Sequence, residues 1–143
     1  MGRDLEIRPF DPIDEERVVR LWKACGLVVP WNDPHRDIGR KLHVQAGLFL
    51  VGLIDGEIVA TAMAGYDGHR GWINYLAVHP DHQREGLGKQ MMEAAEKRLG
   101  TLGCPKINVQ VRRGNTNVIG FYRAIGYTED DVLSLGKRLV SDE

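Results

Sequence analysis

Two glycines stand where a strand-like segment gives way to a long amphipathic helix, and they indicate a site that binds an anion. They are Gly86 and Gly88, between the apolar segment 72–80 and a helical pattern over 87–99. The first N–H groups of a helix lack intrahelical partners and carry the positive end of the helix dipole. Glycine lets a ligand approach the main chain closely, so this helix start is suited to a phosphate.

The surrounding residues exclude two common phosphate loops. A P-loop needs glycine where Gln83 stands and a hydroxyl residue where Gln90 stands, so the magnesium ligand of a nucleoside triphosphate is missing. A dinucleotide-binding loop needs a third glycine where Met91 stands, and close packing of helix on strand would fail there. What remains is the pattern Gln-x-x-Gly-x-Gly over 83–88, after a strand that ends in Val-His-Pro.

The elements that must position this loop predict an α/β fold with a mixed sheet in the order β-α-α-β-β-β-α-β-α-β. The helix over about 12–25 is expected to bury Ile13, Val18, Leu21 and Trp22. Asp33 is expected to N-cap a short helix that begins at Pro34 and reaches Val44. The predicted strands are 5–10, two strands within 47–68 around the Asp55-Gly56 turn, 72–80, 106–111 and 131–139, and the later helices begin at the glycine loop and at Asn115.

The bulk composition favours one small domain whose overall charge attracts no partner, and it leaves a local basic patch open. We expect a single domain over 1–143, because 143 residues at 43% hydrophobic content can bury one core. The net charge of −1 gives no overall attraction to nucleic acid or to an anionic membrane. No apolar run reaches transmembrane length, and the charged start has neither a signal-peptide core nor a myristoylation pattern. The distant Cys25 and Cys104 predict free thiols in a reducing cytoplasm.

Together, these segments resemble the GNAT (Gcn5-related) N-acetyltransferase superfamily along nearly the whole chain. The loop over 83–88 is similar to the acyl-CoA-binding motif of that family. The segment "NTNVIGFYRAIGY" is similar to its next motif, with Val118 at a position where alanine is usual and matches at Asn115, Phe121, Tyr122, Gly126 and Tyr127. The stretches "PWNDP", "YDGHRG" and "VLSLGKRL" further resemble the small bacterial YpeA-type acetyltransferases.

The resemblance implies acetyl-CoA as cosubstrate and assigns residues to it. The pyrophosphate would lie on the main chain of the loop, formed by Gln83, Arg84, Glu85, Gly86, Leu87, Gly88 and Lys89. The pantetheine arm would bind along a strand from which the next strand diverges, at Leu76, Ala77 and Val78. Asn115 would bind the cofactor by a hydrogen bond, and Tyr122 would be the general acid near the sulfur.

Acyl transfer from a thioester to an amine needs a neutral amine, a polarised carbonyl and a proton for the departing thiolate. A phenol such as Tyr122 suits the last task, since its proton is available throughout the neutral range. The structural alternative is that Tyr122 only packs beside Ile119 and Ile125.

A general base is not evident, because the strand over 72–78 carries Asn74 and Tyr75 rather than a carboxylate. A water chain, or no base at all, remains open. Candidates from nearby loops are Asp33, Asp67 and His69, which also read as an N-cap, a turn residue and a solvated loop residue. Trp31 either lines an amine pocket or covers the core.

No metal site is expected, since Pro80 interrupts any helix that would align His79 with His82. The predicted function is transfer of an acetyl group from acetyl-CoA to a primary amine, in a protein, peptide or small metabolite, within a ternary complex. The alternative is a non-catalytic acyl-CoA-binding sensory module. The sequence leaves the acceptor open, and it also leaves open a homodimer in which the last strand pairs between protomers.

Overall fold

The computed structural model describes residues 5–143, which fall into two compact units. The first holds the described residues up to Val109 together with Asp142–Glu143, and the second holds Gln110–Ser141. The expected single domain over 1–143 stays a prediction.

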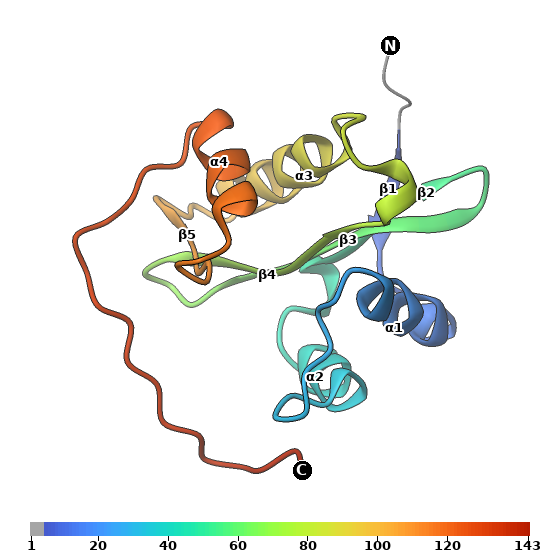
Figure 1. The fold of residues 1–143 in the computed structure, drawn as a ribbon, viewed down its shortest axis with the longest axis horizontal. Helices are drawn as coiled ribbons and strands as arrows, with labels where there is room; N and C mark the ends of the chain where they lie inside the picture. Colours follow the sequence, from blue (N-terminus) through green and yellow to red (C-terminus); the bar gives the residue numbers. More distant parts are fainter. Residues whose placement is uncertain (1–4) are drawn as a thin grey trace. The chain divides into compact units, whose positions relative to one another are not determined.

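The first unit is built on a five-stranded sheet in the order β1-β2-β3-β4-β5 (Figure 1). Its first three pairings are antiparallel and the pairing of β4 with β5 is parallel, so the predicted α/β fold with a mixed, mostly antiparallel sheet is confirmed. The predicted hairpin turn joins β2 to β3 at Asp55 and Gly56, whose φ angles of 51° and 80° are the left-handed values that such a turn requires. The strands are β1 Glu6–Pro9, β2 Phe49–Ile54, β3 Glu57–Tyr66, β4 Gly71–Val78 and β5 Ile107–Val109.

Helices cover both faces of this sheet. Figure 1 shows α1 (Glu15–Ala24) and α2 (Pro34–Lys41) on one face and α3 (Leu87–Thr101) on the other. The apolar face of α3 is buried as its spacing predicts, at Leu87, Met91, Met92, Ala95 and Leu99. On the opposite face, α1 and α2 enclose a second group of buried side chains with the sheet, among them Val18, Leu21, Trp22, Ile38 and Phe49.

The prediction for the start of the first helix was wrong at Ile13, which is 81% exposed. Residues Pro12–Asp14 form a 3-10 helix before α1, and its three residues per turn break the 3.6-residue spacing that the prediction extended to Ile13. Asp14 turns inward instead, and its carboxylate accepts hydrogen bonds from Arg8 at 2.7 and 3.1 Å and from Arg17 at 2.8 Å. These guanidinium groups balance the buried charge.

The second helix ends earlier than predicted, at Lys41 rather than Val44. The chain turns over residues 42–44 and reaches Gln45 in a left-handed conformation with φ 53°, which a continuing helix does not allow. The Gln45 side chain donates to the carbonyl of Tyr66 and accepts from its N–H, at 2.9 and 2.8 Å. The turn is therefore held to the end of β3.

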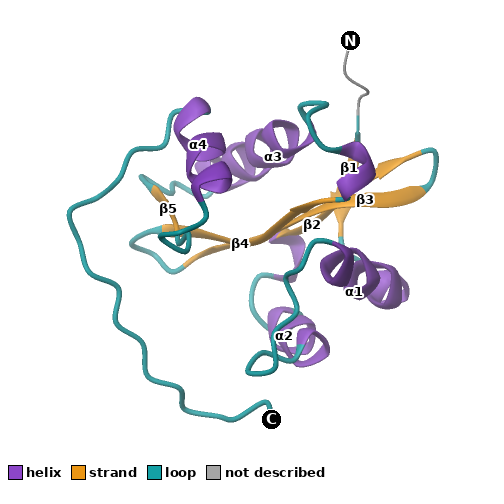
Figure 2. Cartoon of the chain, viewed as in Figure 1, coloured by secondary structure: helices purple, strands orange, loops and turns teal. Residues whose placement is uncertain are grey.

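The second unit contains α4 (Thr116–Ala124) and lacks the final strand predicted over 131–139. Figure 2 shows that segment as loop. Its apolar side chains are exposed at Val132, Leu133, Leu135 and Leu139. A strand needs a neighbour to accept its ladder of hydrogen bonds, and in the described residues this segment pairs with none, so its β propensity is not realised.

The helices and the cysteines bear on the sequence predictions about a membrane span and a disulfide. No helix among residues 5–143 is long and apolar enough to cross a membrane. Cys25 and Cys104 are both free thiols, as predicted.

Candidate functional site

The strand β4 has an open edge over its second half. The neighbouring strand β5 pairs with it only from Gly71 to Ile73, so among the described residues no strand lies beside Asn74–Val78 on that edge. Such an edge presents main-chain N–H and C=O groups to a ligand. The predicted divergence of the strand after β4 stays a prediction, because the chain after Val109 belongs to the second unit.

A β-bulge lies in the same part of β4. On the β3 side, Ala77 pairs with Thr61 and Asn74 with Met63, so the register shifts between these pairs. Tyr75 lies in the bulge with φ 50°, a left-handed conformation that is uncommon for a non-glycine residue. A bulge twists and bends its strand, and bulges are frequent next to functional sites.

The loop after β4 opens α3 without a side-chain cap. Gly86 is the N-cap residue with φ 79°, and Arg84 before it also has a left-handed φ of 65°. The first N–H groups of α3 have no partner inside the helix. A Cβ built on Gly86 would meet no atom within 4 Å, so the space beside this residue is open. The anion site predicted at this helix start stays a prediction.

Side chains tie this loop to the end of β4. Gln83 Nε2 donates to the carbonyl of Val78 at 3.1 Å, and Cys25 Sγ lies 3.3 Å from the same oxygen. The Val78 carbonyl, which the resemblance assigns to pantetheine, is thus already hydrogen-bonded. Further along the loop, His82 Nδ1 and Glu85 Oε2 are buried 3.5 Å apart, and neither has a hydrogen-bond partner.

The open edge and the uncapped helix start suit two neighbouring parts of a CoA molecule, the pantetheine arm and the diphosphate. Both belong to the first unit and are joined directly by residues 79–86. Amide groups of a ligand can pair with the strand edge, and a diphosphate can accept from the N–H groups at the start of α3.

A carboxylate approaches β4 from α2, and the sequence analysis did not identify it. The hydroxyl of Tyr75 donates to Asp37 Oδ2 at 2.6 Å, and the Tyr75 ring stacks on Trp22 with centroids 3.8 Å apart. Burial, together with the Asp37 carboxylate, raises the pKa of Tyr75 well above its usual value. Asp37 also accepts from Arg40 at 3.1 Å. No local sequence signal reveals this pair, because it joins residues 38 positions apart.

The base candidates proposed from the sequence are held in local structure. Asp33 caps α2, accepting from the N–H groups of His35 at 2.8 Å and Arg36 at 3.3 Å. Asp67 accepts from the N–H groups of His69 and Arg70 at 2.8 Å each in the turn after β3, and these bonds lower its pKa. His69 is exposed in the same turn.

A cavity of about 320 Å³ lies between α1 and the start of α2. Asp33 is part of its wall, whereas Trp31, Asp67 and His69 are not. Trp31 is 45% exposed, and both alternatives for it stay predictions. The remaining walls combine apolar with polar and charged side chains, and they are formed by Val19, Lys23, Val28, Val29, Pro30, Asn32, Pro34, His35 and Asp142.

The second unit carries the other predicted cofactor residues. Asn115 is the N-cap residue of α4, although its side chain makes no capping hydrogen bond. Tyr122 is buried on α4 and meets the rings of Phe121 and Tyr127 edge-on, with centroids 5.1 and 5.5 Å away. Burial raises the pKa of Tyr122 to about 12, so its hydroxyl keeps its proton at neutral pH.

Three glutamate and histidine side chains also approach one another on the surface, at Glu15, Glu16 and His35. His35 Nδ1 lies 2.6 Å from Glu15 Oε2, and this contact raises the pKa of His35. An exposed group of this kind is common in proteins without a metal ion, and we assign it no metal.

Comparison with known proteins adds a family and a fold. The family model described as the acetyltransferase (GNAT) family matches residues 14–127. The match spans both the loop before α3 and the helix α4.

Solved structures with similar folds include two acetyltransferases and the protein Ard1. AAC(6')-Iy in complex with a CoA-linked bisubstrate analogue has a TM-score of 0.78 at 19% identity, over 95% of this chain and 99% of that chain. The ribosomal-protein-S18-alanine N-acetyltransferase from Escherichia coli has a TM-score of 0.74 at 21% identity, over 88% and 79%. Ard1 from Thermoplasma volcanium has a TM-score of 0.76 at 24% identity, over 88% and 84%. These likenesses show a shared fold.

Proposed function

The chain belongs to the acetyltransferase (GNAT) family, and on that premise we propose that it transfers an acetyl group from acetyl-CoA to a primary amine. The observation that carries the proposal is the open edge of β4 followed directly by the uncapped start of α3. The CoA and CoA-analogue complexes among the similar folds support the choice of cosubstrate. The stretches "PWNDP" and "YDGHRG" support a place near the YpeA-type acetyltransferases.

The residues that would hold the cosubstrate are those of the sequence prediction. The main chain of Gln83–Lys89 would bind the pyrophosphate, and Leu76–Val78 would bind the pantetheine amides along the open edge. Asn115 would add a hydrogen bond from α4. When bound, acetyl-CoA supplies an activated thioester carbonyl and a thiolate leaving group.

Proton transfer divides between two residues in this proposal. Tyr122 gives a proton to the departing sulfur, which its pKa of about 12 supports because the hydroxyl is protonated at neutral pH. Asp37 takes a proton from the acceptor ammonium, directly or through the hydroxyl of Tyr75. Asp37 replaces Asp33, Asp67 and His69 as our preferred base, because its carboxylate reaches the bulge of β4.

The proposal also includes the cellular compartment of the protein and the pocket that binds the acceptor amine. The free thiols Cys25 and Cys104 support a reducing cytoplasm as the place of action. The cavity beside Asp33 supports a pocket for the acceptor amine, since its volume is that of a small-molecule site.

Cosubstrate binding is tested first, by calorimetry and thermal shift with CoA. Gly86→Ala adds a methyl group beside the helix start, at a φ of 79° that is unfavourable for alanine. The strain should shift the main-chain N–H groups that would bind the diphosphate. We expect CoA binding to weaken about tenfold or more, because each 1.4 kcal/mol of lost binding free energy is a factor of ten. Gly100→Ala is the matched control near the other end of α3, where φ is not positive and no atom lies within 4 Å of the new Cβ. Equal CoA affinity in both variants would contradict the proposed pyrophosphate site.

Turnover is tested separately, by thiol release from acetyl-CoA across a panel of primary amines. Release that depends on the acceptor supports the transferase. CoA binding without such release from any amine would instead support the sensory module.

A further inference from the structure

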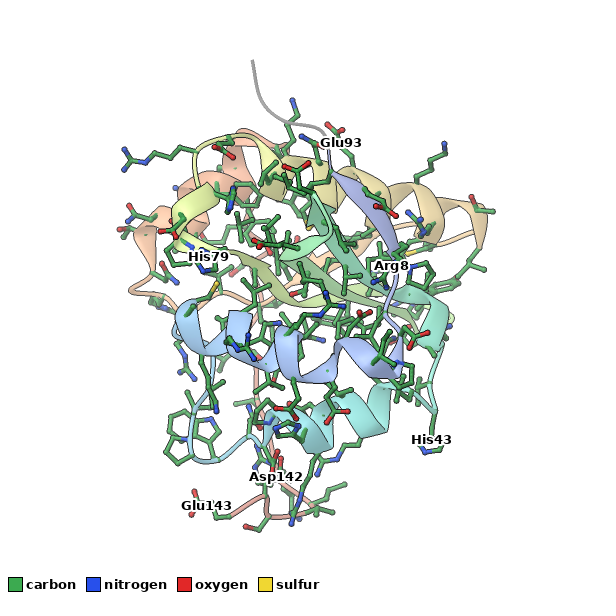
Figure 3. The ribbon with its side chains drawn as sticks, turned by 90° about the vertical axis from the view of Figure 1, so that its right-hand side faces the viewer. Arg8, His43, His79, Glu93, Asp142 and Glu143 are labelled. Carbon is green, nitrogen blue, oxygen red and sulfur yellow. The ribbon has the colours of Figure 1, made fainter. Side chains whose placement is uncertain are left out.

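The carboxylate of Asp142 lies against α2, far along the chain from the residues that bind it (Figure 3). Its Oδ1 accepts from Arg40 Nη2 at 2.5 Å, and its Oδ2 accepts from Arg40 Nη1 at 3.2 Å. The main-chain N–H of Asp33, the N-cap residue of α2, donates to the same Oδ2 at 2.9 Å. The side chain of Asp142 has no exposed surface, so these groups enclose it.

A second guanidinium completes the charge around this carboxylate. Arg36 Nη1 lies 3.8 Å from Asp142 Oδ1. Two other carboxylates share these guanidinium groups: Asp37 accepts from Arg40 Nη1 at 3.1 Å, and Asp33, which caps α2, lies 3.9 Å from Arg36 Nε. Two guanidinium groups, a main-chain N–H and the positive end of a helix together form a receptor for a carboxylate, and bidentate arginine pairs give such receptors their geometry.

The carboxylate also borders the cavity between α1 and α2. Asp142 is part of the cavity wall, together with Asp33 and the apolar side chains of Val28, Val29 and Pro30. A volume of about 320 Å³ accommodates a small ligand next to Asp142. The carboxylate receptor and the room for the rest of a molecule are therefore adjacent.

The chain leading to Asp142 has no regular structure. Residues 128–141 form neither helix nor strand, and their apolar side chains at Leu133, Leu135 and Leu139 are exposed. Asp142 follows directly on this segment, and a ligand carboxylate that took its place on Arg40 would accept the same kind of charge-assisted hydrogen bonds.

We propose that Arg36, Arg40 and the Asp33 N–H form a carboxylate subsite for the acceptor, which Asp142 occupies when no acceptor is bound. The inference rests on the proposed function and narrows it: the acceptor carries a carboxylate as well as its amine, as amino acids and peptides do. Asp142 then competes with the acceptor from within the same chain, and the competition does not depend on the protein concentration.

The kinetic test compares each acceptor with its amide. The series consists of ω-amino acids of increasing length and free dipeptides, each beside its C-terminal amide. Arg40→Gln and Arg36→Gln should raise KM for the acids by about tenfold or more and leave KM for the amides unchanged, because only the acids lose a charge-assisted bond. Arg20→Gln, an exposed arginine on α1, is the matched control. Arg40 also donates to Asp37, the proposed base, so Arg40→Gln could change kcat for every acceptor. Such a change affects an acid and its amide equally, and it therefore cancels in the ratio of their kcat/KM values.

The internal competitor is tested by removing its charge. The double variant Asp142→Asn, Glu143→Gln is used, since the neighbouring carboxylate could otherwise take the place of the first. Its KM for the acids should fall, by about tenfold if Asp142 fills the subsite about nine-tenths of the time, and its KM for the amides should stay the same. Equal changes for acids and amides, or none, would overturn the subsite.

A binding measurement keeps the inference separate from catalysis. The full-length double variant Asp142→Asn, Glu143→Gln is titrated with a fluorescent peptide of residues 132–143 and with the same peptide carrying D142N and E143Q, both prepared as C-terminal amides. Binding of the first peptide, displaced by β-alanine but not by β-alaninamide and reduced by Arg40→Gln, supports the subsite even if no amine is acetylated. Equal binding of both peptides, or none, overturns it, whereas acceptor-dependent thiol release in the same preparation would leave the proposed function standing.

Discussion

Replacing Tyr75 by phenylalanine should remove one hydrogen bond and keep the ring in place. The ring stacks on Trp22 with an angle of 13° between the planes, and this contact does not need the hydroxyl. The hydroxyl donates to Asp37 over 2.6 Å. Tyr75→Phe therefore isolates the link between the bulge of β4 and the carboxylate on α2.

The expected loss of unfolding free energy in Tyr75→Phe follows from the surroundings of the Tyr75 hydroxyl and the Asp37 carboxylate. A hydrogen bond to a charged group contributes about 1.5–3 kcal/mol net. The side chain of Asp37 is 24% exposed, so water can replace the lost donor, and the low end applies: about 1.5 kcal/mol of the free energy of unfolding. In a double-mutant cycle of Tyr75→Phe with Asp37→Ala, the coupling free energy between the two side chains should be about 1 kcal/mol, which is most of the loss caused by Tyr75→Phe alone.

Urea unfolding of the four proteins measures that coupling. A value below about 0.3 kcal/mol, within the additivity expected of independent sites, would show that the two side chains do not interact. Steady-state kinetics then test the proposed base, for which Asp37→Asn should lower kcat by about 10²- to 10⁴-fold. If Tyr75 relays the proton, Tyr75→Phe lowers kcat similarly. A kcat for Asp37→Asn close to that of the wild type would refute the assignment.

Three other substitutions test the packing, the pH response and the acid. Gly71→Ala would place a Cβ 2.8 Å from Cys104 Sγ, and it should lower the free energy of unfolding by about 1–3 kcal/mol; an unchanged melting temperature would show that the neighbours move freely. Hydrogen bonds from Arg8 lower the pKa of Asp14, so its stabilisation is complete above the unfolded pKa of about 3.9 and is lost as the pH falls through the folded value. The difference in the free energy of unfolding between wild type and Asp14→Asn, from urea titrations, should therefore shrink below about pH 4, and a difference independent of pH would contradict this. Tyr122→Phe should lower kcat more than CoA affinity, and unchanged kcat with a good amine would remove Tyr122 from the mechanism.

The parts of the fold that the sequence predicted well depend on local interactions. The Asp55-Gly56 turn needs two left-handed residues, and few other dipeptides supply them. The cap of α2 at Asp33 needs only the next three residues. The wrong predictions came from applying a local pattern where other contacts decide, at the 3-10 helix of Ile13 and at residues 131–139, which pair with no strand among the described residues.

The candidate site also has parts that the sequence predicted from local interactions and parts that depend on contacts between distant residues. The loop before α3 was predictable because Gly86 and its neighbours set the conformation themselves. The hydrogen bond between Tyr75 and Asp37 joins residues 38 positions apart. The contact of Asp142 with α2 joins residues more than 100 positions apart. Tertiary packing decides which of several carboxylates comes near β4, and a single sequence carries no signal for that choice.

The stacking of Trp22 on Tyr75 also gives the protein an optical reporter. Trp22 has no exposed surface, and its indole N–H donates to Thr61 Oγ1 at 2.9 Å, so its emission should lie to the blue of that of the half-exposed Trp31. Because Tyr75 lies in the bulge of β4, a molecule that settles along this strand and moves the phenol will alter the quenching of Trp22. Occupancy of the strand edge can then be followed by intrinsic fluorescence, without labelling the protein and before any acceptor is known.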